Sequence, residues 1–293
     1  MMNKWRGTLF TLLLVGALGL IFVTTSSVQA AFAPDLVAYW KLDEAAGPSY
    51  VDEIIPAYDG AGNGNPDPVA GQVNGAQDFN GTDDGIDVSD ADDFDWGPYE
   101  NFTIEFWMKK STAVGSGGAS DNEVMIGRQE GVVQWWIGVH NTDGLARFFI
   151  TLGGAGVQLN SAARVDDGEW HHIVVMRAGE EGPPLTGEWR LYVDNGAPVV
   201  SPGGGADLTL TTDITMGYLQ AAPSDYYYEG ILDQVAIYTR ALTADEIDKN
   251  YNLGLEGLEL DDDLPDPPDN GDGDDDKKSG GGSSGCFIST SHQ

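Results

Sequence analysis

Asp233 holds the most unusual position for its chemistry, within the strand-like run 231–238. In the two-residue period of a strand, its side chain shares a face with Val235 and Ile237. A carboxylate on an apolar face must be protonated, accept several hydrogen bonds or pair with a cation. The sequence therefore predicts a partner for Asp233 elsewhere in the chain. The alternative is a different strand phase, which would leave the side chain exposed.

Paired carboxylates would be needed for glycoside hydrolysis, because such enzymes place two acids across one sugar bond. Glu105 shares its strand face with Thr103, Trp107 and Lys109, and none of these is acidic. Glu246 falls in a predicted helix. No nucleophile elbow is predicted, because the G-x-S-x-G pattern occurs at 281–285 in the Gly/Ser-rich tail and not between a strand and a helix, and the one cysteine lies near the C-terminus. We therefore expect no catalytic residues and no enzyme activity.

Aromatic side chains provide a different kind of candidate site, since sugars dock their C–H faces on rings that also offer polar groups. The candidate ligand-binding residues are Trp135, Trp136 and Tyr227. Neighbouring residues of a strand point to opposite faces, so one of the two tryptophans is expected in the core.

The charge of the chain excludes one class of partner. Its 293 residues include 14 Lys and Arg against 47 Asp and Glu, for a net charge of -33. Nucleic-acid binding needs a basic surface, so we expect no nucleic-acid partner. Strong acidity favours divalent cations, cationic partners or simple solubility.

The N-terminal residues 1–30 are predicted to be a signal peptide. Lys4 and Arg6 precede the apolar run 9–23, and Val28-Gln29-Ala30 matches a cleavage pattern. A membrane anchor is the alternative, although about 20 apolar residues are needed to cross a bilayer. We expect a secreted or surface-displayed protein with no transmembrane helix in the mature chain.

The intervening residues predict an all-β domain over 31–257. Strand-like runs separated by turns occur at 36–42, 102–109, 124–127, 132–140, 145–152, 171–177, 189–193, 208–216 and 231–238. Thr243 and Glu246 form a capping box at the start of one short C-terminal helix. Residues 258–278 are predicted to be a disordered acidic spacer, followed by a Gly/Ser-rich tail over 279–293. The pattern indicates an antiparallel two-sheet sandwich.

Several segments together resemble the LamG-like jelly-roll domains of the concanavalin A-like lectin/glucanase superfamily. They are LVAYWKLDE at 36–44, DFNGTDDGIDV at 78–88, FTIEFW at 102–107, GEWHHIV at 168–174, LYVDNG at 191–196 and the closing segment 230–251. The resemblance implies two stacked antiparallel sheets with the first and last strands close together.

The resemblance also implies a structural calcium ion near the terminal strands, with Asp43, Asp52 and Asp233 as candidate ligands. Calcium takes six to eight oxygen ligands, so carbonyls would have to join the carboxylates. The alternative is that Asp233 accepts backbone N–H bonds or pairs with a basic side chain.

The resemblance implies a non-catalytic binding module for polysaccharide or a surface glycoconjugate. A structural or adhesive protein that binds another protein is the alternative, and a glycoside hydrolase of the same fold is a third. The tail segment around Cys286 resembles the Gly-rich Cys-Phe-Ile C-termini of some exported bacterial proteins, which implies processing or anchoring at Cys286. A free thiol is the alternative there.

Overall fold

The computed structural model describes most of the predicted domain. The described residues are 33, 35–110, 122–154, 156–180, 186–203, 205–220 and 226–262. The predicted signal peptide, most of the acidic spacer and the tail with Cys286 lie outside these residues.

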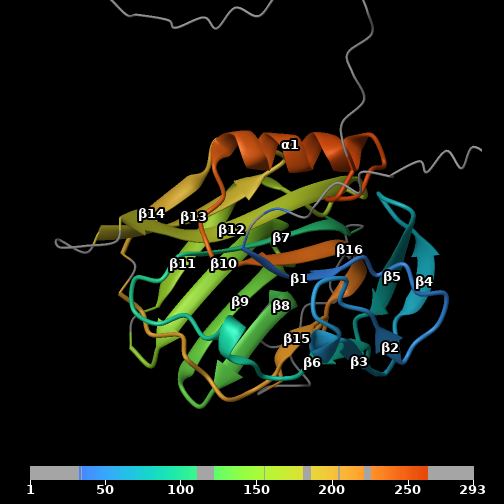
Figure 1. The fold of residues 1–293 in the computed structure, drawn as a ribbon, viewed down its shortest axis with the longest axis horizontal. Helices are drawn as coiled ribbons and strands as arrows, with labels where there is room; N and C mark the ends of the chain where they lie inside the picture. The colour runs from blue at the N-terminus through green and yellow to red at the C-terminus, as the bar shows by residue number, and fades with distance from the viewer. Residues whose placement is uncertain are drawn as a thin grey trace, which may run out of the picture.

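Two antiparallel sheets of eight strands each form the framework, as the sequence predicts (Figure 1). Sheet A contains β1 (Leu36–Trp40), β4 (Asp67–Ala70), β5 (Gly75–Asn80), β7 (Phe102–Lys109), β12 (Trp170–Glu180), β13 (Thr186–Val193), β14 (Val199–Pro202) and β16 (Glu229–Tyr238). Sheet B contains β2 (Ser49–Tyr50), β3 (Gly60–Asn63), β6 (Gly85–Val88), β8 (Asn122–Glu130), β9 (Val133–His140), β10 (Leu145–Leu152), β11 (Val157–Arg164) and β15 (Ile214–Met216).

The first and last strands lie side by side, as the family resemblance implies. β1 pairs with β16, and Trp40 lies opposite Val235. The run predicted at 208–216 is shorter as a strand, because only Ile214–Met216 joins sheet B while Leu208 forms an isolated bridge with Trp96. The all-β jelly-roll sandwich is confirmed.

Alternating side chains of both sheets meet in one apolar core. On β7, Phe102, Ile104 and Phe106 point inward and are buried, and on β9 the inward residue Trp135 is fully buried. The inward-facing rings of Trp96 and Phe102 stack with their centroids 3.9 Å apart. This core fills most of the space between the two sheets.

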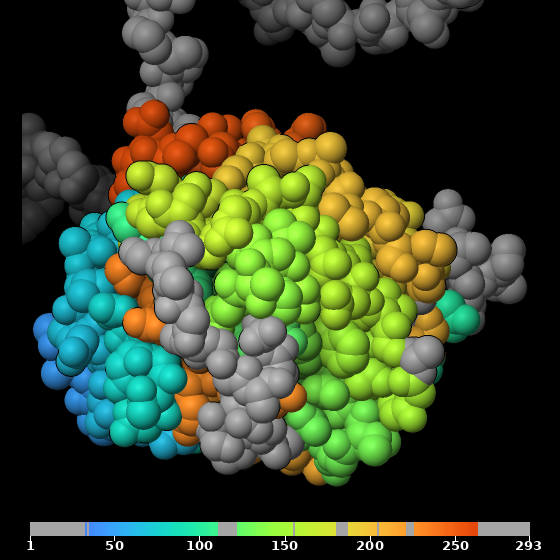
Figure 2. All heavy atoms as spheres, turned by 180° about the vertical axis from the view of Figure 1, so that it is seen from behind, coloured from blue at the N-terminus to red at the C-terminus, as the bar shows by residue number. Residues whose placement is uncertain are grey.

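The helix α1 (Ala244–Leu255) covers the outer face of sheet A. Thr243 and Glu246 form the predicted capping box, with the Glu246 amide donating to the Thr243 hydroxyl over 3.3 Å. Ile247 is buried against Tyr238 and other residues of a second apolar cluster. Figures 1 and 2 both place α1 at the top of the molecule, with the green strands of sheet B below.

Ordered packing continues past the predicted domain boundary at residue 257. Leu260 packs against the cluster beneath α1, and Glu259 pairs with Lys41 over 2.5 Å. The described fold therefore extends to Asp262, because this short segment still carries an apolar side chain that sheet A can bury.

A glycine inside α1 allows the helix to approach sheet A. A Cβ added at Gly254 would lie 2.4 Å from Nε1 of Trp107. We expect Gly254→Ala to lower the free energy of unfolding by about 1–3 kcal/mol, although alanine is favoured in helices by about 1 kcal/mol. Urea denaturation will measure this, with the exposed Lys249→Ala as control. A more stable Gly254→Ala variant would contradict the close packing.

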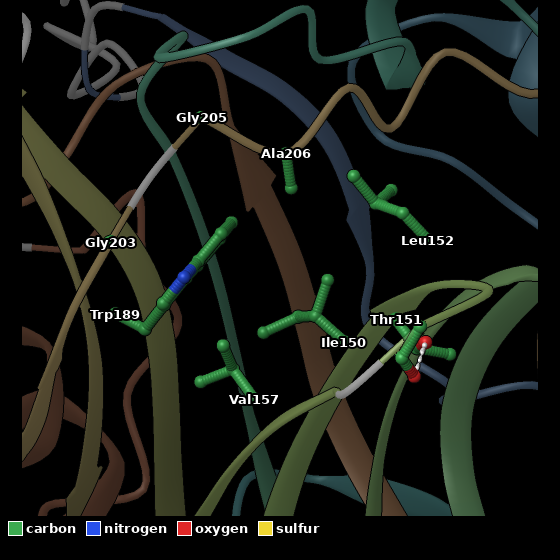
Figure 3. A pocket seen from close by; sticks show the side chains of 9 residues that line it. Ile150, Thr151, Leu152, Val157, Trp189, Gly203, Gly205 and Ala206 are labelled. Carbon is green, nitrogen blue, oxygen red and sulfur yellow. Dashed lines mark hydrogen bonds between the residues drawn. The ribbon is translucent and has the colours of Figure 1, made fainter.

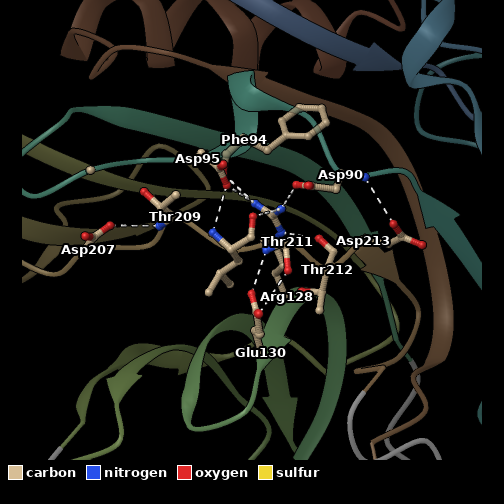
Figure 4. A network of polar contacts seen from close by, with 12 residues as sticks. Asp90, Phe94, Asp95, Arg128, Glu130, Asp207, Thr209, Thr211, Thr212 and Asp213 are labelled. Atoms are coloured by element: carbon tan, nitrogen blue, oxygen red, sulfur yellow. Dashed lines mark hydrogen bonds and ion pairs between the residues drawn. The ribbon is translucent and has the colours of Figure 1, made fainter.

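A buried arginine lies at the centre of a network of polar contacts (Figure 4). Arg128 lies opposite Trp135, so it points into the core face, and none of it is exposed. Its guanidinium pairs with Asp95 over 2.9 Å and also with Asp90. It donates to the carbonyls of Phe94, Leu210 and Thr212 over 3.0, 2.8 and 2.6 Å. One side chain thus joins the loops that precede β7 and β15.

Candidate functional site

Asp233 is buried, but on the opposite face from the one that strict alternation predicts. Gln234 has a left-handed φ of 54°, and the pairing of β16 with β7 shifts between Asp233 and Ala236. This bulge inserts one residue, so Asp233 faces outward opposite Trp107 while Val235 stays in the core. The predicted shared face was wrong, and the burial arises from segments that cover the outer face of sheet A.

The contacts of Asp233 leave one of its oxygens without a partner. Oδ2 accepts a hydrogen bond from the Val73 amide over 2.9 Å, whereas Oδ1 is buried with no hydrogen-bond partner. Burial raises the pKa of Asp233 to about 8, the Val73 amide lowers it, and the charge of Asp43 raises it. Backbone donation, one of the sequence-based alternatives, is therefore present but does not satisfy the whole carboxyl group.

The three predicted calcium ligands do not gather at one place. Asp52 accepts amide hydrogen bonds from Tyr39, Ile54 and Ile55 over 2.7, 3.2 and 3.0 Å, so it fixes a turn and leaves the candidate set. In the part of the chain that the structure describes, no group of three or more His, Cys, Asp or Glu side chains could hold a metal ion.

Asp43 and Asp233 remain as a pair of candidate calcium ligands. Asp43 accepts from the Gly75 amide over 2.7 Å, and burial raises its pKa. Two neighbouring carboxyl groups and the unpartnered Oδ1 of Asp233 suit a hard cation, provided that carbonyls and water complete the shell. Carboxylate oxygens are the type of ligand that calcium prefers, but two side chains supply fewer oxygens than the six to eight that calcium takes.

Glu105 is not placed for catalysis in an open cleft. It is 1% exposed beneath α1 and accepts from the Tyr238 hydroxyl and the Asn250 amide, each over 2.7 Å. Its second oxygen lies 3.3 Å from Nε2 of His172. These contacts make Glu105 a residue that holds α1 against sheet A.

Trp135 and Trp136 point to opposite faces of β9, as expected for adjacent strand residues. Trp135 is fully buried in the core, so its ring is not accessible and it leaves the set of candidate ligand-binding residues. Trp136 lies on the outer face of sheet B and stacks on Phe149 with centroids 5.2 Å apart. Since Trp136 is itself only 5% exposed, it supports the more accessible ring of Phe149.

Strand register places aromatic and polar groups in one row on the outer face of sheet B. Phe149 lies opposite both Gln158 and Trp136, and the row continues through Gly127 and Thr215 to Asp87. Directly opposed residues of antiparallel strands share a face. Gly127 and Thr215 in the middle of this row are buried, so the row is accessible towards its two ends, and we call the row the sheet-B face.

The polar side chains around Phe149 provide hydrogen-bonding groups for a ligand. Arg147 and Asn160 form the next pair on the same face, and Gln158 and Asn160 are exposed. Arg147 donates to Asn122 and Asp143, each over 3.1 Å, which holds its guanidinium in place. We call Arg147, Phe149, Gln158 and Asn160 the Phe149 patch.

Tyr227 forms a second aromatic position on the sheet-B face. Its ring is half-buried and stacks on Tyr218 with centroids 5.5 Å apart. The Tyr218 hydroxyl donates to Asp87 and accepts from the Asn63 amide over 3.1 Å. Tyr227 therefore sits on a ring that polar groups hold in place at the other end of the row.

The Phe149 patch was not among the residues predicted from the sequence. A signal for it exists, because strict alternation along 145–152 puts Arg147, Phe149 and Thr151 together on the face opposite the apolar Phe148 and Ile150. The sequence-based prediction instead placed the ligand at Trp135, Trp136 and Tyr227.

The comparison with protein families identifies the class of protein. Residues 80–248, more than half of the chain, match the family model described as the concanavalin A-like lectin/glucanases superfamily (Laminin_G_3). The chain belongs to this superfamily. A sequence comparison with curated proteins found no significant match.

Solved structures share the fold at low sequence identity. The binding domain of Paraclostridial Mosquitocidal Protein 1 has a TM-score of 0.58 and 14% identity over 74% of this chain and 52% of that one. The receptor binding domain of botulinum neurotoxin C/D mosaic serotype has a TM-score of 0.55 and 14% identity, over 74% and 51%. This chain thus spans about half the length of these toxin domains.

A third similar structure matches over nearly its full length. It is domain 4 of AbnA, a GH43 extracellular arabinanase from Geobacillus stearothermophilus, in complex with arabinotriose. Its TM-score is 0.51 at 16% identity, over 77% of this chain and 98% of that domain. At such identities these likenesses show the shared fold.

The described residues contain no helix that is long and apolar enough to cross a membrane.

Proposed function

We propose that this chain is an exported, non-catalytic module that binds polysaccharide or a surface glycoconjugate on the sheet-B face. The observation that carries the proposal is the row in which Trp136 supports the Phe149 ring beside the exposed Gln158 and Asn160. A ring flanked by amide and guanidinium donors suits the C–H faces and hydroxyl groups of a sugar. The arabinotriose complex of the structurally similar arabinanase domain supports the ligand class by analogy.

A glycan array with the purified chain tests this proposal. We expect saturable binding to at least one oligosaccharide family, since the sheet-B face has groups for both stacking and hydrogen bonding. If every glycan fails while a surface-protein pull-down captures one specific partner, the proposal gives way to its alternative, a structural or adhesive protein that binds another protein.

Removal of the Phe149 ring should weaken glycan binding specifically. We expect Phe149→Ala to raise the dissociation constant about tenfold, because about 1.4 kcal/mol of stacking would be lost. Isothermal titration with the best array ligand will measure this. The matched control is Trp170→Ala, which removes a half-buried ring from sheet A and should change the constant less than twofold. Equal effects of both variants would contradict the assigned surface.

We also propose that Asp43 and Asp233 hold a structural calcium ion. Such an ion would supply charge neutralisation to the buried carboxylates and fix the segment around Val73, with no part in chemistry. Elemental analysis should find about one calcium per chain, and a chelator should lower the melting temperature. A protein free of metal that melts identically in chelator and in added calcium would overturn this part.

A cleft lined by carboxylates is a location at which the glycosidase alternative can be tested. A cleft of about 440 Å³ is lined by Asp92, Asp93, Asp95 and Glu100, with Arg240 at its side. Asp95 is paired with Arg128, and Asp93 accepts from the Tyr58 hydroxyl over 2.8 Å. These structural contacts favour binding over turnover. Release of reducing sugar from polysaccharides that bind on the array would support the glycosidase alternative.

A further inference from the structure

An apolar cleft opens between the two sheets at the edge formed by β10, β11 and β13. It has a volume of about 340 Å³. The side chains of Ile150, Val157, Trp189 and Ala206 converge on it, with Leu152 at one side (Figure 3). Ile150 and Trp189 belong to the main core, so the cleft is a continuation of the core that reaches the surface.

Glycines form part of one wall of the cleft. Ile150 and Leu152 share a face of β10, but Ile150 is 3% exposed whereas Leu152 is 48% exposed. The segment that passes on the other side contributes Gly203 and Gly205. A Cβ at Gly205 would lie 2.8 Å from the Tyr99 hydroxyl, so a side chain there could not fill the gap without a shift.

The lining selects against charged ligands. Among the described residues that form the cleft, no side chain is charged. The hydroxyl of Thr151 is already used, since it donates to the Gly154 carbonyl over 3.3 Å and accepts from the Gly153 amide over 3.1 Å. The whole chain carries a net charge of -33, which disfavours anions in particular.

The volume sets the size of the ligand. An apolar protein cavity of about 150 Å³ binds benzene, and this cleft has roughly twice that volume. We propose that the cleft is a binding site for an uncharged apolar group, either a fused pair of rings or a short acyl chain. The site uses the inner faces of the strands and is therefore separate from the sheet-B face.

Two dyes that differ by one sulfonate test both the apolar and the charge requirement. N-phenyl-1-naphthylamine is uncharged, and 8-anilino-1-naphthalenesulfonate is its anionic counterpart. We expect saturable fluorescence enhancement by the neutral dye at one site per chain, with the anionic dye at least tenfold weaker. Displacement of the neutral dye by octan-1-ol indicates an acyl chain, and displacement by indole indicates rings. Failure of both competitors overturns the proposal, as does equal binding of the two dyes.

Variants locate the binding in the cleft. Ala206→Phe should fill it and weaken the neutral dye at least tenfold, whereas Ala162→Phe adds a ring at an exposed position of β11 and should change affinity less than twofold. Thermal melting will check that Ala206→Phe folds. If it does not, Leu152→Asp places a charge at the half-exposed rim and should give the same loss. Wild-type affinity in the folded cleft variant would overturn the assignment.

Discussion

The Asp233→Asn variant is expected to be more stable than wild type at pH 7 by up to about 4 kcal/mol when calcium is chelated. Asp233 is fully buried, and burial raises its pKa from 3.8 to about 8. The metal-free native state therefore keeps this proton, while the unfolded chain releases it near pH 4. Asparagine avoids this cost and keeps an oxygen for the Val73 amide.

The sign of this stability difference follows from the number of protons that the native and unfolded states bind at each pH. Below about pH 4 both states hold the proton, and the two proteins should be similarly stable. Between about pH 4 and 8 the unfolded state binds fewer protons, so wild-type stability falls by up to about 1.4 kcal/mol per pH unit and then levels off. The Asp233→Asn variant should lack this decline.

Urea denaturation in chelator at pH 4, 5.5, 7 and 8.5 will measure both proteins. Asp67→Asn, at an exposed position of β4, is the control and should change stability by less than about 0.5 kcal/mol. With calcium added, the order should reverse, because asparagine is a weaker ligand than a carboxylate. A variant that is less stable in chelator at pH 7 would show that Asp233 is ionised and satisfied by protein donors.

The Arg128→Met variant is expected to lose about 3–5 kcal/mol of unfolding free energy. Methionine preserves much of the apolar stem, but the carbonyls of Phe94, Leu210 and Thr212 lose their donor (Figure 4). Asp95 loses its cation and keeps the hydrogen bond from the Leu210 amide over 3.0 Å. Buried carbonyls without partners are costly, and the loss of a cation from a partly buried carboxylate adds to that cost.

Arg190→Met is the matched control for this variant. Arg190 pairs with Glu188 at the surface of β13 and is about one third exposed. Surface ion pairs contribute about 0–1 kcal/mol, so the control should remain close to wild type. Urea denaturation and the melting temperature of both variants will decide. Equal stability of the two variants would mean that the Arg128 network contributes little.

Much of the fold could be predicted because its signals are local. Alternating runs such as 102–109 and 145–152 became strands, and the capping box at Thr243 began the helix at Ala244. The face of Asp233 could not be predicted, since the bulge at Gln234 depends on how β16 pairs with its neighbours. A single inserted residue reverses the face of every residue beyond it.

The candidate site was harder to predict because it joins distant segments. Asp87 and Phe149 lie on the same face of sheet B, on strands that three others separate, and the register of five strands sets this arrangement. The sequence predicts that one of Trp135 and Trp136 lies in the core, but the structure is needed to show that it is Trp135. The family resemblance predicts Asp52 as a calcium ligand. In the structure its carboxylate oxygens instead accept hydrogen bonds from the amides of Tyr39, Ile54 and Ile55.

Mapping of amide and indole chemical shifts on addition of the best array glycan tests the central claim most directly. The account predicts that the shifts concentrate at Phe149, Gln158 and the indole N–H of Trp136, with the outer face of sheet A beneath α1 unchanged. Saturable binding that perturbs sheet A, or the edges alone, and leaves these three positions unchanged would contradict it.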